Sequence, residues 1–203
     1  NSHFRLFGKI EAMNPAGSIK DRSALHMLRE ALALGQISSG TTIIESSSGN
    51  MAIGLAQACA YWDLTLICVV DVRTTQQNIE ILQAYGAEIS LVSVPLPGTD
   101  SLLEARKQRV QALLAAVSDS YCPDQYANPN NFAAHYLGTM PEIIAALGAE
   151  INYLFLATST SGTLRGCAEY IRDHGLATKV VAVDAIGSVI FGDKPQARLL
   201  PGH

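Results

Sequence analysis

The 203-residue sequence has no long apolar run and no excess of charge of one sign. Its apolar stretches stay short of the ~18 residues that a membrane-spanning helix needs, so we expect no contact with a membrane. With 14 basic and 18 acidic side chains, the formal net charge is −4 and no basic stripe is present. The charge therefore gives no reason to expect nucleic-acid binding.

Cysteine is scarce, and the four cysteines lack the spacing of a metal site. Cys59, Cys68, Cys122 and Cys167 lie far apart, so we interpret them as small buried side chains in a cytoplasmic protein. The histidines are scattered as well, and we expect no metal. Walker and Gly-x-Gly-x-x-Gly fingerprints are also missing, which disfavours a nucleotide-binding domain.

Segments rich in β-branched residues alternate with helical ones. Strands are predicted over 41–45, 64–70, 88–94, 153–157 and 179–184, with a further strand near the start at 5–10. Helices are predicted over 51–61, 75–85, 100–117 and 164–173. This alternation is typical of βαβ units and of parallel sheets with helices on both faces, so the sequence predicts an α/β fold.

Ligands of open α/β sheets bind where strands end and helices begin, and three loops there carry unusual chemistry. In the first, Pro15 and Gly17 predict a tight turn, and Ser18 can cap the next helix. Lys20 then lies in the first helical turn, where the positive helix end disfavours an ammonium group and favours imine chemistry. A solvated surface lysine is the alternative interpretation of this loop alone.

The other two loops are rich in hydroxyl groups. Residues 45–51 place three serines, a glycine and Asn50 at a helix start, a group of donors that suits a carboxylate. Simple helix capping is the alternative there. Residues 158–163, Thr-Ser-Thr-Ser-Gly-Thr, follow a strand and open a helix, which is a phosphate-binding arrangement.

In this order, the three loops resemble those of fold-type II pyridoxal-5′-phosphate (PLP) enzymes of the cysteine synthase/cystathionine β-synthase family. The segments that carry the resemblance are Asn14–Arg22, Ser47–Asn50 and Gln125–Pro129. The resemblance implies two three-layer αβα domains with mostly parallel sheets, like tryptophan synthase β. A smaller mobile domain would span 17–124, and 1–16 with 125–203 would belong to the larger PLP-binding domain. Because the chain starts beside a strand and ends in a turn signal at 200–203, we expect a fold truncated at both ends.

The same resemblance implies the roles of the site residues. Lys20 would be the catalytic residue, carrying PLP as a Schiff base and then removing the substrate Cα proton. Asn50 would bind the 3′-oxygen of the cofactor. The cofactor phosphate would be held by Ser159, Thr160, Ser161, Gly162 and Thr163. The substrate carboxylate would be held by Ser47, Ser48, Gly49, the backbone N–H of Met51, and Gln125. The family's usual serine partner of the pyridine nitrogen is expected beyond His203.

Three departures from typical cysteine synthases narrow the choice. Met51 stands where they have threonine, residues 159–163 replace a glycine-rich loop, and Tyr126 replaces phenylalanine. These differences and the segment 183–192 resemble a siderophore-biosynthesis subgroup. By the same resemblance Tyr126 and Arg106 would contact substrate, and a guanidinium suits a leaving phosphate. A solvated position on a charged helix is the alternative for Arg106.

The expected function is therefore that of a PLP-dependent transferase acting by β-replacement. It would join O-phospho-L-serine and L-glutamate to N-(2-amino-2-carboxyethyl)-L-glutamate and phosphate, a precursor of 2,3-diaminopropionate. A homodimer is the family's usual state. Two alternatives stay open. One is a cysteine synthase using O-acetyl- or O-phosphoserine and sulfide, and the other is a catalytically silent binding protein of the same fold.

Overall fold

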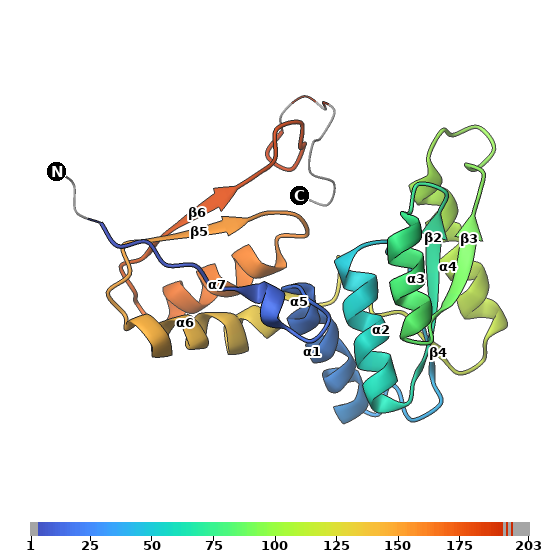
Figure 1. Cartoon of the computed structure of the whole chain (residues 1–203), viewed down its shortest axis with the longest axis horizontal. Helices are drawn as coiled ribbons and strands as arrows, with labels where there is room; N and C mark the ends of the chain where they lie inside the picture. Colours follow the sequence, from blue (N-terminus) through green and yellow to red (C-terminus); the bar gives the residue numbers. More distant parts are fainter. Residues whose placement is uncertain (1–3, 193, 195, 197–203) are drawn as a thin grey trace.

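The computed structural model describes residues 4–192, 194 and 196, and it forms two lobes, each built on its own parallel sheet (Figure 1). The predicted α/β class with parallel sheets is confirmed. The turn expected at 200–203 lies outside the described residues. No helix in the described part of the chain is both long and apolar enough to cross a membrane.

The first lobe is a three-layer sandwich. Its sheet has the order β3-β2-β1-β4 and consists of β1 (Thr42–Glu45), β2 (Thr65–Asp71), β3 (Glu88–Val92) and β4 (Ser120–Tyr121). Side chains alternate along the strands: Ile43 and Leu66 face one side of the sheet, whereas Ile44 and Val69 face the other. The first side packs on α2 (Asn50–Trp62) and α3 (Gln76–Ala84), and the second packs on α4 (Leu102–Ala116).

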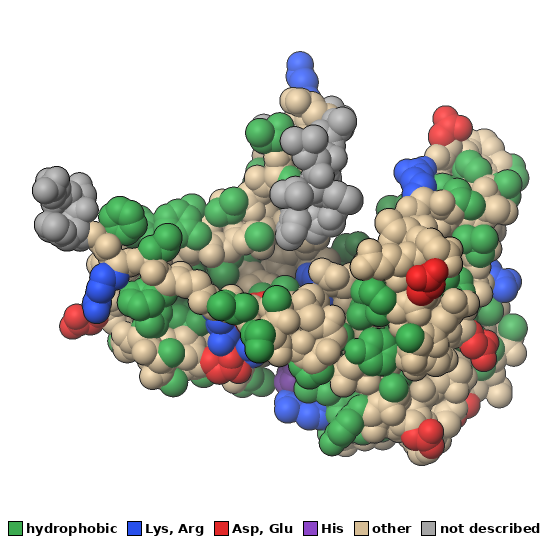
Figure 2. All heavy atoms as spheres, viewed as in Figure 1, with side chains coloured by type: hydrophobic (Ala, Val, Ile, Leu, Met, Phe, Trp, Pro, Cys, Tyr) green, Lys and Arg blue, Asp and Glu red, His purple; other side chains and the backbone are tan. Residues whose placement is uncertain are grey.

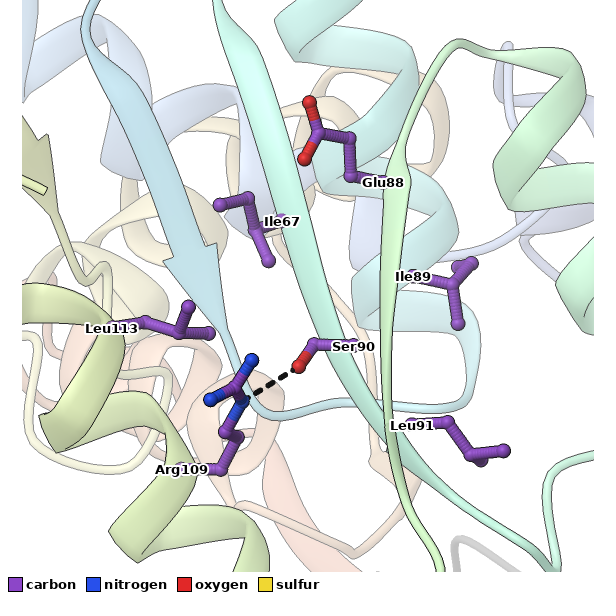
Figure 3. Close-up of a pocket in the computed structure, with 7 residues that line it drawn as sticks. All are labelled: Ile67, Glu88, Ile89, Ser90, Leu91, Arg109 and Leu113. Atoms are coloured by element: carbon purple, nitrogen blue, oxygen red, sulfur yellow. Dashed lines mark hydrogen bonds between the residues drawn. The ribbon is translucent and has the colours of Figure 1, made fainter. Parts of the chain in front are cut away.

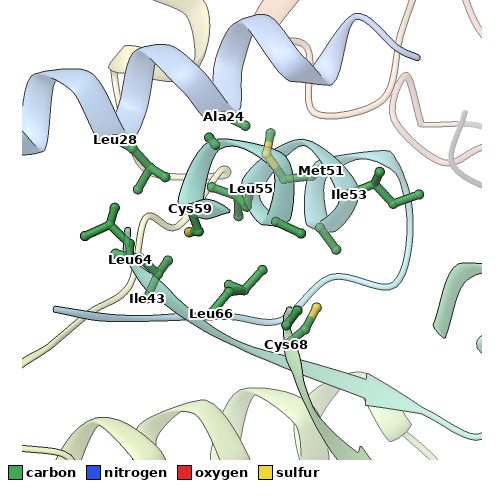
Figure 4. Close-up of a cluster of buried hydrophobic side chains, with 14 of the residues drawn as sticks. Ala24, Leu28, Ile43, Met51, Ile53, Leu55, Cys59, Leu64, Leu66 and Cys68 are labelled. Atoms are coloured by element: carbon green, nitrogen blue, oxygen red, sulfur yellow. The ribbon is translucent and has the colours of Figure 1, made fainter. Parts of the chain in front are cut away.

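Helix α1 (Lys20–Ala33) packs across α2 in a hydrophobic core to which α1 contributes Ala24 and Leu28 and α2 contributes Met51 and Leu55 (Figure 4). Gly54 of α2 permits the close approach. A Cβ atom at Gly54 would lie 3.2 Å from the Ala24 Cβ atom and 3.3 Å from the backbone of Asp21. The start of α1, which carries Lys20, is therefore held directly against the first half of α2.

The second lobe has a two-stranded sheet of β5 (Tyr153–Ala157) and β6 (Lys179–Val183). Helices α6 (Met140–Leu147) and α7 (Gly162–Asp173) pack on one of its faces through Met140, Cys167 and Ile171. On the opposite face, Tyr153 and Phe155 are exposed among the described residues. A short helix α5 (Asn130–Ala134) and the π-helical turn η2 (His135–Thr139) lead into α6.

Helix α1 also joins the lobes, because it packs on α5 as well as on α2. Arg22 of α1 reinforces this joint. Its Nε atom donates to the Glu11 Oε2 atom at 2.7 Å, and its two terminal nitrogens donate to the Glu142 carboxylate at 2.8 Å each. Glu11 lies in the short helix η1 (Glu11–Met13), and Lys9 also donates to Glu142. The N-terminal segment, α1 and α6 are thus held together by one charge cluster.

Most predicted strands and helices are found within two residues of their predicted bounds. The strand predicted at 5–10 is wrong, because this segment pairs with no strand of the described residues. Five elements were not predicted: η1, β4, α5, η2 and α6. The domain division at 17–124 stays a prediction.

Candidate active site

The three loops singled out in the sequence lie at carboxyl ends of strands or at helix starts. Residues 46–49 connect β1 to α2, residues 158–161 connect β5 to α7, and the lysine loop leads into α1. Figure 2 shows that the molecule is hollowed between the two lobes that carry these loops.

The lysine loop forms the tight turn that its sequence predicts. The Gly17 N–H donates to the Asn14 carbonyl at 2.8 Å, and Gly17 has a φ of +88°, which only glycine adopts easily. The Ser18 hydroxyl accepts the backbone N–H of Lys20 at 3.2 Å, and the buried Asp21 carboxylate accepts the Ala16 N–H at 2.7 Å. The turn therefore fixes Lys20 as the first residue of α1.

The Lys20 side chain is half-buried, and burial lowers its pKa from the usual range. Its amine has no hydrogen-bond or ion-pair partner within the part of the chain that the structure describes. Burial without a counter-ion disfavours the charged ammonium form of Lys20 and so favours the neutral amine. This is the protonation state that a nucleophilic lysine needs.

Residues 158–163, the phosphate-type loop, lead directly into the start of α7. Ser161 adopts a left-handed conformation (φ 61°, ψ 8°), and Gly162 begins the helix. A Cβ atom at Gly162 would lie 2.6 Å from the Asn131 Oδ1 atom, so glycine is needed for this close packing. The Asn131 amide nitrogen donates to the Gln125 carbonyl at 2.7 Å and to the Thr160 hydroxyl at 3.3 Å. Asn131 thereby links this loop to the segment that carries Gln125.

His135 connects this loop to the lysine helix. Its Nε2 atom lies 3.1 Å from the Ser23 hydroxyl, one turn after Lys20, and 3.2 Å from the Thr163 hydroxyl. Its Nδ1 atom lies 2.8 Å from the Thr139 hydroxyl. Burial, and then the positive charges of Lys20 and Arg22, lower the pKa of His135 to about 3. A neutral imidazole therefore bridges α1 and the start of α7.

Residues 45–51, the carboxylate-type loop, are held by hydrogen bonds at three of their peptide groups. The Ser46 N–H donates to the Glu45 Oε1 atom at 2.9 Å. The Cys68 thiol of β2 donates to the Ser47 carbonyl at 3.0 Å, and the Asn78 amide of α3 donates to the Ser48 carbonyl at 2.7 Å. Burial raises the thiol pKa of Cys68 to about 12, so this donor keeps its proton.

The predicted ligands of this loop differ in exposure. Asn50 is exposed and makes no hydrogen bond through its side chain to the described residues, so its amide is available to a ligand. The Met51 side chain is buried in the core at 2% exposure, so only its backbone can face a ligand. Gln125 is buried nearby, whereas Tyr126 is 75% exposed.

Arg106 of α4 reaches the end of β2, where its Nε atom lies 3.3 Å from the Asp71 Oδ2 atom. Its side chain is 15% exposed, and the Nε atom has no hydrogen-bond partner of good geometry among the described residues. The guanidinium is therefore oriented by Asp71, while part of its donor capacity is unused.

A shallow hollow of about 330 Å³ lies elsewhere, over β3 and α4 (Figure 3). Ile67 and Leu113 line it, and the Arg109 Nε atom donates to the Ser90 hydroxyl at 2.9 Å. It contains none of the residues of the three loops, so we do not assign it to the site. The described residues contain no group of three potential metal ligands.

Sequence reasoning found the loops but missed residues that hold them. Glu45, Asn78, Asn131 and His135 had no sequence signal of their own, because each acts through a partner that is distant in the chain or through backbone atoms. The roles predicted for Lys20 and the other site residues stay predictions.

Comparisons with known proteins give matches over nearly the whole chain. The family model described as "Pyridoxal-phosphate dependent enzyme" matches residues 1–199. A protein of Ralstonia nicotianae named N-(2-amino-2-carboxyethyl)-L-glutamate synthase is 45% identical over 197 residues, which are 97% of this chain and 58% of that protein. A protein of the same name from Cupriavidus metallidurans is 43% identical over the same shares. The chain thus spans about 58% of the length of these curated relatives.

A solved structure gives the same picture at the level of the fold. The O-acetylserine-dependent cystathionine β-synthase from Helicobacter pylori superposes with a TM-score of 0.85 and is 32% identical in sequence. The match covers 96% of this chain and 62% of that one.

Proposed function

The chain belongs to the pyridoxal-phosphate dependent enzyme family, and from this premise we propose that it joins O-phospho-L-serine to the amine of L-glutamate. The products are N-(2-amino-2-carboxyethyl)-L-glutamate, a precursor of 2,3-diaminopropionate and siderophores, and inorganic phosphate. The two relatives that carry the name of this synthase support the proposal at 45% and 43% identity. The structural observation that carries it is the partner-free amine of Lys20, which the Ser23–His135–Thr163 contacts tie to the phosphate-type loop.

The residues present fit PLP. Lys20 offers an amine with a lowered pKa and no competing partner among the described residues. Ser159 to Thr163 offer hydroxyl groups and the N-terminal amides of α7 to a phosphate. Asn50 offers an uncommitted amide to the phenolic oxygen. When bound, PLP supplies an electron sink that stabilises negative charge at the Cα atom of an amino acid.

The chain's own residues then divide the work of binding and proton transfer. The loop at Ser47 to Met51, together with Gln125, holds the carboxylate of O-phospho-L-serine. The Lys20 amine takes the proton from the substrate Cα atom and returns it when the product forms. A half-buried lysine with a lowered pKa suits this exchange, because the proton must be held only for part of the cycle.

Arg106 and Tyr126 are proposed to contact the leaving phosphate and the incoming amino acid, respectively. The Arg106 guanidinium binds the phosphate that leaves the substrate Cβ atom, through the donors that Asp71 leaves free. The exposed Tyr126 faces solvent and contacts the incoming L-glutamate. The cytoplasmic location and the homodimer expected from the family are proposals as well.

Turnover with two nucleophiles tests the function. The PLP-loaded protein is given O-phospho-L-serine with either L-glutamate or sulfide, and phosphate release and the organic product are measured by mass spectrometry. We expect the glutamate adduct to form. Cysteine formed with sulfide, and no adduct with glutamate, would identify a cysteine synthase instead. Tight PLP binding without turnover of either would favour the silent binding protein.

The lysine assignment has its own measurement. Borohydride should fix the cofactor to the peptide that contains Lys20, and the Lys20→Ala variant should lose both this label and turnover. Lys107→Ala is the matched control, because Lys107 is an exposed lysine that pairs with Glu104 on the same helix. Label retained in the Lys20→Ala protein would contradict the assignment.

A further inference from the structure

Asn78 has a contact that neither the fold nor the family resemblance requires. It lies in the first turn of α3, and its side-chain amide donates to the Ser48 carbonyl at 2.7 Å, 30 residues away in the chain. Its own backbone N–H donates to the Thr75 hydroxyl that caps α3, so the helix start is satisfied without its side chain. The amide of Asn78 is thus committed to the carboxylate-type loop.

Because a peptide group is planar, the contact of Asn78 with the Ser48 carbonyl also fixes the direction of the Gly49 N–H. In a trans peptide the carbonyl oxygen and the following N–H point to opposite sides. Because the Ser48 carbonyl is held on the side of α3, the Gly49 N–H points away from α3.

The preceding peptide group follows the same rule. The Cys68 thiol in the core holds the Ser47 carbonyl, so the Ser48 N–H points away from β2. Neither the Ser48 nor the Gly49 N–H has an acceptor among the described residues. Two adjacent donors at the start of α2 are therefore oriented and unused, as an anion site needs.

We propose that Asn78 is a positioning residue of the substrate site, because it fixes the Ser48 carbonyl and thereby aims the Gly49 N–H at the substrate carboxylate. This inference rests on the proposed function of the loop. Cys68 holds the neighbouring peptide from the buried side, whereas Asn78 holds it from a separate helix. The contact therefore makes carboxylate binding depend on the placement of α3 against α2.

Asn78→Asp is the most informative variant. It keeps the shape of the side chain but cannot donate to the Ser48 carbonyl, and its charge is favourable in the first turn of a helix. Gln77→Glu is the matched control, since it makes the same chemical change at the next position of α3, where the exposed Gln77 has no partner among the described residues. Asn78→Ala removes the donor without adding a charge.

The first measurement is hydrogen exchange of the amides of residues 52–55 in the PLP-loaded protein without substrate, because the first hydrogen bond of α2, from the Ile53 N–H to the Gly49 carbonyl at 3.3 Å, starts from this loop. We expect faster exchange in both Asn78 variants and no change in Gln77→Glu. The second is the affinity for O-phospho-L-serine, read from the cofactor absorbance. Loss of one hydrogen bond of ~1 kcal/mol predicts that Kd and KM rise by roughly 3- to 10-fold, with kcat changed less.

The outcomes distinguish a failure of the role proposed for Asn78 from a failure of the proposed function. Unchanged exchange in the Asn78 variants, or equal Kd values for wild type and both variants, would overturn the role of Asn78. Faster exchange in a protein that never binds O-phospho-L-serine would leave Asn78 as an anchor of the loop and overturn the proposed function instead. Asn78→Gln keeps an amide donor and should recover part of the lost affinity, which a purely structural defect in α3 would not allow.

Discussion

At the scale of single residues, Glu45 is unusual because it is a buried carboxylate without an ion-pair partner among the described residues. It lies at the end of β1 at 4% exposure. Its Oε1 atom accepts the Ser46 N–H, while its Oε2 atom has no hydrogen-bond partner among the described residues. Burial raises the pKa of Glu45 to about 7, and hydrogen bonds from the backbone of Ser46, Asp124 and Gln125 oppose this shift. Cys68, Cys122 and Asp124 are the titratable groups around it, and they supply no positive charge.

Glu45 therefore predicts a pH-dependent stability. Between pH 4.5, the unshifted value, and about 7, the folded protein keeps a proton that the unfolded chain loses. Folding stability contributed by this group is thus full below pH 4.5 and is lost as pH rises through 7. Glu45→Gln removes this titration. We expect the free energy of unfolding of the variant, relative to wild type, to increase by up to about 3 kcal/mol from pH 4 to pH 8.

Urea denaturation of both proteins across this pH range measures the effect. Replacing the carboxylate by an amide also changes the free energy of unfolding by an amount that does not depend on pH. The test is therefore how the difference in free energy of unfolding between variant and wild type changes with pH. Parallel pH curves for the two proteins would show that Glu45 has an ordinary pKa.

At the scale of elements, the position of α7 depends on a close backbone approach. A Cβ atom at Gly166 would clash with the Phe132 carbonyl oxygen and would lie 2.8 Å from the Cβ atom of His135. Helix α7 therefore lies directly on α5 and η2, and this contact sets where its N-terminus points. The geometry of the phosphate-type loop follows from the packing of the helix behind it.

Gly166→Ala should displace α7. We expect a loss of about 1–3 kcal/mol of folding stability from overpacking and a weaker affinity for PLP, measured by thermal unfolding and by cofactor titration. Gly138→Ala in η2 is the matched control, because the nearest atom to its new Cβ is the Arg22 Nη1 atom at 3.6 Å, an ordinary contact distance. Equal PLP affinity in the two variants would mean that α7 does not set the phosphate site.

The elements also show how far sequence could predict this molecule. Short segments rich in β-branched and apolar residues predicted the strands, because strands of parallel sheets that are covered on both faces consist of such runs. The three loops were found because glycine, serine and lysine at helix starts have local causes. Contacts such as Ser23 with His135, 112 residues apart, have no local signature, since they exist only after the lobes pack. Helix α5 and η2 were missed in the segment that forms this packing.

At the scale of the whole molecule, the joint between the N-terminal segment, α1 and α6 rests on Arg22. Its side chain is 18% exposed and makes three hydrogen bonds to two carboxylates. The hydrogen bond from Arg22 is the largest cause that lowers the pKa of Glu142 to about 2. A fork of this kind fixes both distance and orientation, which a single ammonium group cannot do.

Arg22→Lys keeps the charge and removes the fork. We expect a loss of roughly 1.5 to 3 kcal/mol of folding stability, the range for hydrogen bonds to charged groups. Arg172→Lys is the matched control, because Arg172 is 70% exposed and pairs with the adjacent Asp173 at the end of α7. In wild type the contribution of Glu142 should vanish as pH falls from 4.5 to 2, since its pKa is depressed in the folded state. A loss for Arg22→Lys no greater than that for Arg172→Lys would show that the joint does not depend on the fork.

The peptide groups aimed by Cys68 and Asn78 have a consequence for how such an enzyme can change. In the proposed site, backbone N–H groups bind the carboxylate that every α-amino acid carries. Replacing the side chains of Ser47 or Ser48 therefore need not abolish carboxylate binding. Selectivity then resides in side chains from other elements, such as Arg106 and Tyr126. Substitutions at those positions during evolution can change which acceptor or leaving group is used, while the backbone N–H groups still bind the carboxylate that all the substrates share.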